Sequence, residues 1–442
     1  HKVAIKYKAN DFAFWVDGVE VATVTTGNAP IGLDRLSFNL ANANDFFGKT
    51  KCVAVWKEAL SDQELADLTY PTPTDPTFAL DFDTIATDFT FARGSEATYV
   101  DAQGLIQSTA SNNTPRLDYS TGAEAFLLEP QSTNLVLTSD SGTYGSAPSS
   151  ETNTISPDGT NNAIIPTPDS NANRYQEALA GGVYSNGQKI TYSWYRKRIS
   201  TPVNDTRVGD LQIQALINLT IFESTTQIQS NINEYDRFQV VVQVTDGSLS
   251  STFRAYFGTV VGVGNASVAY WGHQFEVGGY ATSIIPTDGS TVTRNQETCI
   301  NATPEINSEE GVLYFEGRAL TNETTILRSI SLSNGTTQQR ILIRYSSAEN
   351  QLTLYSIENG NVRAVAGTNS YNLLEFNKIA ISYKQNNFKF FVNGTKISED
   401  NSGNTPTLLN KLSFNGGSGE PFFGNTKDVQ VYTKALSDAE LI

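Results

Sequence analysis

The chain is poor in the residues on which many enzymes and secreted modules depend. Its 442 residues include no methionine, only two histidines and only two cysteines, Cys52 and Cys299. Two cysteines cannot staple a small secreted module, so the sequence predicts free thiols rather than a disulfide framework or a redox pair. Two histidines, one of them His1, leave little room for His-based catalysis or a His-rich metal site.

Charge and long apolar runs are also scarce. Charged residues make up 17% of the chain, hydrophobic residues 39%, and the formal net charge is −16. No apolar stretch reaches the ~18–20 residues that a membrane-spanning helix needs. Nucleic acids and anionic membrane surfaces both require clustered cations, and no basic run is present. We therefore expect no membrane insertion and no nucleic-acid partner.

Residues that favour strands and turns are abundant. Threonine, serine, asparagine, glycine and aromatic residues recur in short stretches of period-two alternation, which is typical of half-buried strands. Turn residues interrupt these stretches every ~8–12 residues. The sequence predicts an all-β protein of tandem antiparallel β-sandwiches, with very short capping helices.

A long internal repeat dominates the sequence. Residues 2–66 align with residues 378–442 at a constant offset of 376, without a gap, and 31 of the 65 pairs are identical. Both copies contain a two-residue hairpin signal, Asp17–Gly18 in one and Asn393–Gly394 in the other. Both end in a capping box that predicts a short helix, over 61–68 and over 437–441. This repeat predicts two similar β units.

The two copies differ in what precedes them. Strand-like segments over 311–316, 340–345 and 351–357 lead into the later copy only. Half a sandwich leaves its inner apolar face open, which here comprises Val3, Ile5, Phe12, Phe14 and Leu36. We expect the missing half to be supplied upstream in a longer chain or by a neighbouring chain. The start at His1 without any methionine points to such a longer chain, with a repeat period of 376.

Three segments stand out in each copy of the repeat: 16–18, 46–48 and 59–65 in the first, and 392–394, 422–424 and 435–441 in the second. Through these segments the repeated unit resembles the C-terminal half of a laminin-G-like, concanavalin-type sandwich domain. Many members have an acidic residue after the central glycine, where this chain has Lys51 and Lys427. That departure weakens the case for the family's calcium site. The resemblance implies binding of glycans or proteins.

The middle of the chain holds two distinctive blocks. The opening block spans 91–99, 115–119 and 128–135, and the closing block spans 271–276, 281–287 and 292–294. Together they resemble a pair of blocks found in bacteriophage and prophage virion proteins. A carbohydrate-binding-like jelly roll lies between these blocks in that family, and 157–160 matches its opening. His273 stands where the family commonly has alanine, and we interpret it as a packed residue.

The two resemblances together imply an organisation into four parts. These are 1–70, the C-terminal half of a laminin-G-like sandwich; 71–140, a linking β-segment of virion type; 141–299, a carbohydrate-binding-like jelly roll; and 300–442, a laminin-G-like sandwich. They imply a non-enzymatic phage tail or head fibre, or adhesin, on the virion surface. Its expected partners are host-surface polysaccharide and other virion proteins or copies of itself. A bacterial cell-surface adhesin or filament of the same modules is the alternative.

Glycan binding by a β-sandwich commonly combines an aromatic platform with planar hydrogen-bonding side chains. Two strand-like segments of the predicted jelly roll offer such residues, with Tyr192, Trp194 and Arg196 on one face of the first. Tyr235 and Arg237 recur in a similar setting. The competing interpretation places Trp194 in the core and pairs the arginines with acids.

No motif for catalysis or for a cofactor emerges. Glycosidases need two carboxylates facing each other across a sugar. The acidic pairs of this chain lie in no such signature, so a polysaccharide-cleaving enzyme is the third hypothesis, behind the two binding proteins. We assign no catalytic residue and expect no cofactor. The turns at Asp158, Asp246 and Asp288 could offer oxygens to Ca²⁺, although no twelve-residue calcium loop is present.

Overall fold

The computed structural model describes most of the chain: residues 1–38, 47–48, 50, 52–69, 75–109, 111–140, 150–167, 174–178, 184–199, 212–217, 219–221, 226–246, 252–257, 268–322, 327–345 and 350–441. The chain is all-β, which confirms the expected fold class. Its described helices are short: α1 (Asp62–Thr69), α2 (Ile85–Asp88) and α3 (Asp438–Leu441). None of these helices has the length and apolar character needed to cross a membrane. The chain divides into two compact units, His1–Thr74 and Asp75–Ile442.

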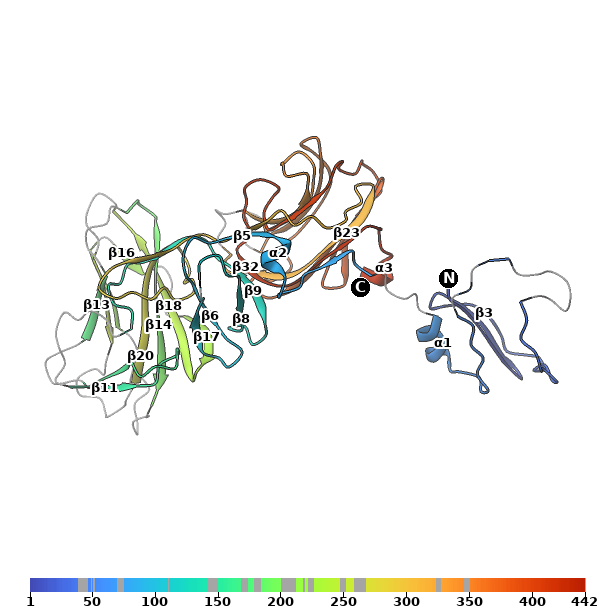
Figure 1. Ribbon diagram of the computed structural model, residues 1–442, viewed down its shortest axis with the longest axis horizontal. Helices are drawn as coiled ribbons and strands as arrows, with labels where there is room; N and C mark the ends of the chain where they lie inside the picture. The colour runs from blue at the N-terminus through green and yellow to red at the C-terminus, as the bar shows by residue number, and fades with distance from the viewer. Residues whose placement is uncertain are drawn as a thin grey trace. The chain divides into compact units, whose positions relative to one another are not determined.

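The first unit is a three-stranded antiparallel sheet with one helix packed on it (Figure 1). Its strands are β1 (Val3–Lys8), β2 (Asp11–Val16) and β3 (Val19–Val24). The β2–β3 turn has positive φ at both Asp17 (49°) and Gly18 (83°), as the hairpin signal predicted. The capping box also forms, because the Ser61 amide donates to Glu64 Oε2 at 2.8 Å and the Glu64 amide donates to Ser61 Oγ at 3.3 Å.

The C-terminal part of the second unit is a two-sheet sandwich. One sheet runs in the order β30 (Thr395–Asp400), β29 (Asn387–Val392), β28 (Asn377–Lys384), β23 (Glu310–Ala319), β32 (Gly424–Tyr432), β9 (Ala125–Leu128) and β8 (Arg116–Asp118), and β4 (Phe78–Ala79) also pairs with β32. The other sheet has five strands, in the order β27 (Asn361–Thr368), β26 (Leu352–Glu358), β25 (Arg340–Tyr345), β24 (Arg328–Ser333) and β31 (Lys411–Ser413). The strands expected over 311–316, 340–345 and 351–357 are therefore present.

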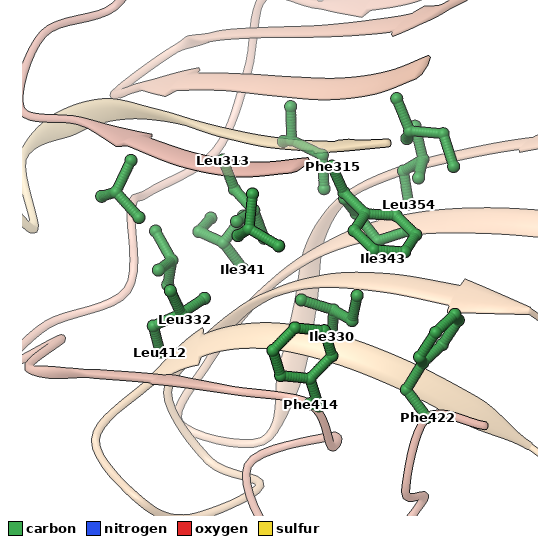
Figure 2. Packing of buried hydrophobic residues seen from close by; sticks show 14 of the residues in the cluster. Leu313, Phe315, Ile330, Leu332, Ile341, Ile343, Leu354, Leu412, Phe414 and Phe422 are labelled. Carbon is green, nitrogen blue, oxygen red and sulfur yellow. The ribbon is translucent and has the colours of Figure 1, made fainter. Parts of the chain in front are cut away.

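The core of this sandwich lies between the two sheets. Alternate residues of each strand point inward, as Figure 2 shows for Leu313 and Phe315 from one sheet and Ile341 and Ile343 from the other. Aromatic residues also pack against one another in this core, where the Phe315 and Phe422 rings meet edge to face with their centres 5.2 Å apart. The predicted linking segment contributes to this core through Phe126 and other residues, because β8 and β9 extend the larger sheet.

The remaining strands come from the linking segment and from the predicted jelly roll. A seven-stranded sheet contains β11 (Ser150–Thr154), β12 (Ala163–Thr167), β20 (Val268–Val277), β14 (Lys189–Arg198), β18 (Tyr235–Val244), β16 (Leu219–Ile221) and β17 (Thr226–Ile232). A three-stranded sheet contains β13 (Arg174–Ala178), β19 (Thr252–Phe257) and β15 (Gln212–Ile217). Three short pairs join β5 (Thr90–Ala92) to β22 (Thr298–Ile300), β6 (Thr98–Val100) to β7 (Ile106–Ser108), and β10 (Ser132–Asn134) to β21 (Val292–Arg294).

Candidate functional site

The aromatic and arginine residues expected to form a glycan platform lie mostly inside the seven-stranded sheet region. Tyr192, Trp194, Tyr235 and Arg237 are each at most 1% exposed. Trp194 stacks on Phe238, and Tyr192 and Trp194 belong to one apolar cluster while Tyr235 belongs to another. Buried rings offer no face to a saccharide, so the competing interpretation, packing in the core, describes these residues.

The two arginines of that set also have internal partners. Arg237 donates to Ser193 Oγ at 3.0 Å and lies over the Tyr195 ring, rather than pairing with an acid as the competing interpretation expected. Arg196 is half-buried, with its guanidinium carbon 4.2 Å from the centre of the Phe238 ring. These five residues therefore do not form one open surface.

His273 is packed, as its sequence setting suggested. It is fully buried on β20, and its Nδ1 lies 2.6 Å from the Tyr192 hydroxyl. Burial disfavours the charged imidazolium and lowers the pKa of His273 to about 3. The imidazole therefore stays neutral at physiological pH and belongs to the core. The cysteines are free thiols, Cys52 exposed and Cys299 buried.

Four residues of the virion-type blocks, Arg93, Arg116, Glu129 and Arg294, form a buried ion-pair network with Glu297. Arg116 Nε donates to Glu297 Oε1 at 2.9 Å, and Arg116 Nη1 lies 2.9 Å from Glu129 Oε2. Arg93 contacts Glu297 at 2.7 Å, and Arg294 contacts Glu129 at 2.7 Å. Arg93, Arg116 and Glu129 belong to the linking segment, 71–140, whereas Arg294 and Glu297 lie near the end of the predicted jelly roll, 141–299. The network therefore ties the linking segment to the end of the jelly-roll segment.

The electrostatics of the network keep Glu129 and Arg116 charged. Burial on its own would raise the pKa of Glu129, but Arg294 and Arg116 outweigh that effect and lower it to about 2. Burial likewise would lower the pKa of Arg116, but Glu297 and Glu129 raise it above its ordinary value. Paired and hydrogen-bonded charges of this kind are costly to break one partner at a time. The role that the geometry supports for these residues is structural.

A hollow of about 220 Å³ lies on the outer face of the eight-stranded sheet, opposite the core of the sandwich. The polar residues that line it from the sheet are Tyr314 of β23, Lys378 of β28, and Gln430 and Tyr432 of β32. Strand alternation places these side chains outward, since their neighbours Leu313, Phe315, Val429 and Val431 point into the core. The apolar part of the lining comprises Val312, Ile379, Ala380, Phe391, Leu436 and Leu441.

The polar side chains of the hollow are ordered by bonds along their own strands. The Tyr432 hydroxyl donates to Gln430 Oε1, and Gln430 Nε2 donates to Asp428 Oδ2 at 2.5 Å. On the neighbouring strand, the Tyr314 hydroxyl donates to Glu316 Oε2 at 3.3 Å. The strand register places Tyr314 beside Gln430 and Glu316 beside Asp428. The floor of the hollow is thus a patch of planar, half-buried side-chain groups that are linked by hydrogen bonds.

The surroundings of the hollow are acidic. The pKa of Tyr314 is raised, first by burial and then by the nearby Glu316 and Asp428, so its phenol stays protonated. Burial also raises the pKa of Asp428, and Glu316 adds to that effect. Glu440 lines the hollow from α3, and Lys378 is its one lining cation. This arrangement can hydrogen-bond neutral hydroxyl groups and opposes an incoming anion.

Metal ligands do not gather in the described part of the chain: no group of three or more His, Cys, Asp or Glu side chains there could hold an ion. The expectation about Ca²⁺ also concerns turns that are only partly described, since Gly247 of the Asp246 turn lies outside the described residues.

Sequence reasoning missed the residues of the hollow. The strand over 311–316 was expected, but Tyr314, Gln430 and Tyr432 were not singled out. The available signal was the alternation of Val312, Tyr314 and Glu316 with inward residues. The pairing of that strand with β32, which creates the hollow, joins segments more than 100 residues apart and leaves no local trace.

Comparison with known families and structures bears on one part of the chain in particular. Residues 314–442 match the model of the concanavalin A-like lectin/glucanases superfamily. The laminin-G-like, concanavalin-type sandwich expected there is thereby confirmed for these residues. No curated protein matched the chain.

Among solved structures, the chain is similar to a carbohydrate-binding module from a bacterium. The CBM40 of the Ruminococcus gnavus IT-sialidase bound to alpha2,3 sialyllactose gives a TM-score of 0.27 at 20% identity, over 30% of this chain and 82% of that chain. The same module bound to alpha2,6 sialyllactose gives a TM-score of 0.26 at 21% identity, again over 30% of this chain and 82% of that chain.

Proposed function

We propose that this chain is a non-enzymatic fibre or adhesin that binds host-surface glycan through the hollow on the outer face of its C-terminal sandwich. The observation that supports the proposal is the hollow itself, in which two tyrosines and Gln430 present planar polar groups beside an apolar wall. Binding sites for small ligands commonly combine such an apolar wall with a few fixed polar groups. The concanavalin A-like superfamily match over 314–442 supports the same proposal.

The size and charge of the hollow define the class of saccharide. About 220 Å³ is below the ~300–1,000 Å³ of enclosed ligand pockets, so the hollow accommodates one sugar ring of a longer chain rather than an enclosed oligosaccharide. Glu316, Asp428 and Glu440 repel carboxylated sugars and accept hydrogen bonds from hydroxyl or ammonium groups. We therefore propose neutral or amino sugars as ligands, in preference to acidic ones.

Glycan-array screening of the full chain, followed by calorimetry on the best ligand, tests this. Tyr432→Phe and Gln430→Ala each remove a polar group of the hollow, and each should weaken binding about 2- to 12-fold, since one hydrogen bond contributes about 0.5–1.5 kcal/mol. Tyr355→Phe is the matched control, because Tyr355 is a half-exposed tyrosine on the other sheet, beside Arg344. Preference for sialylated glycans, or equal loss in the Tyr355 variant, would overturn the assignment of the site.

The setting of the protein is proposed as the virion surface, in line with the resemblance of the middle region. Its proposed partners are host polysaccharide and other virion proteins or copies of itself, and no cofactor is invoked. Immunogold labelling should mark assembled particles; labelling of bacterial cell surfaces instead would favour the bacterial-adhesin alternative.

Incubation with host polysaccharide should release no new reducing ends, and release that depends on single Asp or Glu residues would refute the non-enzymatic role.

A further inference from the structure

The inner face of the first repeat copy is open, while the same face of the second copy is buried. Ile5 is 71% exposed and Val3 is 62% exposed, whereas the aligned Ile381 and Ile379 are both 0% exposed. The contrast continues along the face: Phe14 and Leu36 are exposed, and their counterparts Phe390 and Leu412 are fully buried. Residue type is almost unchanged between the copies, so the difference lies in what covers the face.

In the second copy, the cover is the leading half of the sandwich. Strand β28 lies between β29 and β23, and the five-stranded sheet packs on its inner face. In the first copy, β1 corresponds to β28 and β2 to β29, in the same register. Within the described residues of the first unit, β1 pairs with β2 alone. The edge of β1 that faces away from β2 is therefore open, and so is its inner face. In the second copy, the leading half covers both of these positions on β28.

We propose that this open face is a docking surface for the leading half of a second sandwich of the same kind, a segment that resembles residues 310–376 in sequence. The proposal does not depend on glycan binding. Its edge strand would pair with β1 as β23 pairs with β28, which places a residue equivalent to Leu313 opposite Ile5 and one equivalent to Phe315 opposite Val3. Lys8 at the end of β1 corresponds to Lys384, whose Nζ lies 3.2 Å from Glu310 on the leading half. A docked segment with a residue equivalent to Glu310 would therefore form the same ion pair with Lys8.

The side chains of the face favour this occupant. Apolar exposure on this scale is rare in a protein that works alone, because burying apolar area contributes about 25 cal/mol per Å². The retained residues, Ile5, Phe12, Phe14 and Leu36, are identical to those that pack on the leading half in the second copy. A face selected for a different partner would not need to keep that set. Tyr7 supports the same conclusion, since it is 44% exposed while its counterpart Tyr383 is buried and donates to the Asn307 carbonyl at 2.9 Å.

An extended version of the full chain tests the proposal. Residues 300–376 are added ahead of His1, so that the first copy follows a leading half as the second copy does. Amide exchange of β1 and β2 should then slow by about tenfold or more, and binding of an apolar dye should fall. The control extension contains Leu313→Asp and Phe315→Asp in the added segment and should leave both signals unchanged.

Three outcomes would overturn the proposal. The first is unchanged amide exchange with the native extension, and the second is equal protection by the control extension. The third is concentration-dependent protection of β1 in the unextended chain, with dimers in analytical ultracentrifugation. That outcome would show that the face pairs with the same face of a second copy instead.

Discussion

The two repeat copies have the same local backbone geometry and opposite burial. The Asn10 amide donates to the Gly27 carbonyl and the Asn386 amide to the Gly403 carbonyl, each at 2.9 Å. Both asparagines have φ near +58°, at 59° and 57°, and both copies form the capping box. Yet the inner face is open in one copy and fully buried in the other. Turns and caps are therefore specified within the repeat, whereas burial depends on a half-domain encoded elsewhere.

The outer faces of the copies differ in chemistry as well. Asp428 and Gln430, which anchor the polar floor of the hollow, correspond to Cys52 and Ala54 in the first copy. In that copy Trp15, Ala13 and Leu65 form a small apolar cluster beneath α1. The repeat thus keeps the residues that shape the sheet and varies those that face outward. If the hollow binds saccharide, the first copy should not.

The largest expected effect comes from placing a charge on the inner face. Ile381→Asp buries a carboxylate in the sandwich core and should destabilise the second unit by well over about 4 kcal/mol, enough to unfold it. The aligned Ile5→Asp, at an exposed position, should change the unfolding free energy by no more than about 0.5 kcal/mol. Urea denaturation of the full chain, followed by tryptophan fluorescence and amide exchange, measures both. A similar loss of unfolding free energy in the two variants would show that the inner face of the first copy is buried, and that the two copies do not differ in burial.

The next largest effect concerns the buried ion-pair network. Its five residues all lie in the second unit, so breaking the network should destabilise that unit and leave the first unit unchanged. Glu129→Gln leaves Arg294 and Arg116 partly unpaired in a buried site and should cost about 3–5 kcal/mol. The exposed Glu309→Gln is the control and should be nearly neutral.

The same network predicts a pH dependence. The pKa of Glu129 is about 2 in the folded chain against an ordinary 4.5, so its stabilisation is complete above about pH 4.5 and is lost as the pH falls toward 2. Acid titration of the native chain and of the Glu129→Gln variant should therefore converge at low pH. Curves that stay parallel down to pH 2 would assign the acid sensitivity to other groups.

Local signals in the sequence predicted much of this fold, and non-local contacts limited the rest. Hairpins such as Asp17–Gly18 and the capping boxes were predicted correctly because a few adjacent residues determine them. Alternation along 192–198 correctly separated Tyr192 and Trp194 from Tyr195. It could not show that both faces of that strand are buried, because the covering layers come from distant segments. The ion-pair network was hidden for the same reason, since Arg116 and Glu297 are 181 residues apart.

The smallest expected effect concerns how each capping helix is held to its sheet. In the first copy, Lys6 on β1 lies 2.5 Å from Asp62, the first residue of α1. In the second copy, Lys389 on β29 lies 2.5 Å from the equivalent Asp438. The two lysines lie on different strands, but at positions that face each other across the strand pair. Lys6 pairs with Ala13 in the first copy, and the aligned residues Ser382 and Lys389 pair in the second. Either strand of the pair can therefore supply the cation that holds the helix.

This exchange predicts that the arrangement of the first copy can be transplanted into the second. Lys389→Ala should destabilise the docking of α3 by no more than about 1 kcal/mol, because Asp438 is 40% exposed and solvent screens the pair. It should also raise the pKa of Asp438, which hydrogen bonds from Lys389 and Lys396 now lower. Adding Ser382→Lys should bring that pKa back down, since the new lysine stands at the position of Lys6. NMR titration of Asp438 in the single and double variants measures this. A double variant that titrates like Lys389→Ala alone would show that the two strands are not interchangeable, and that the repeats anchor their helices by separate means.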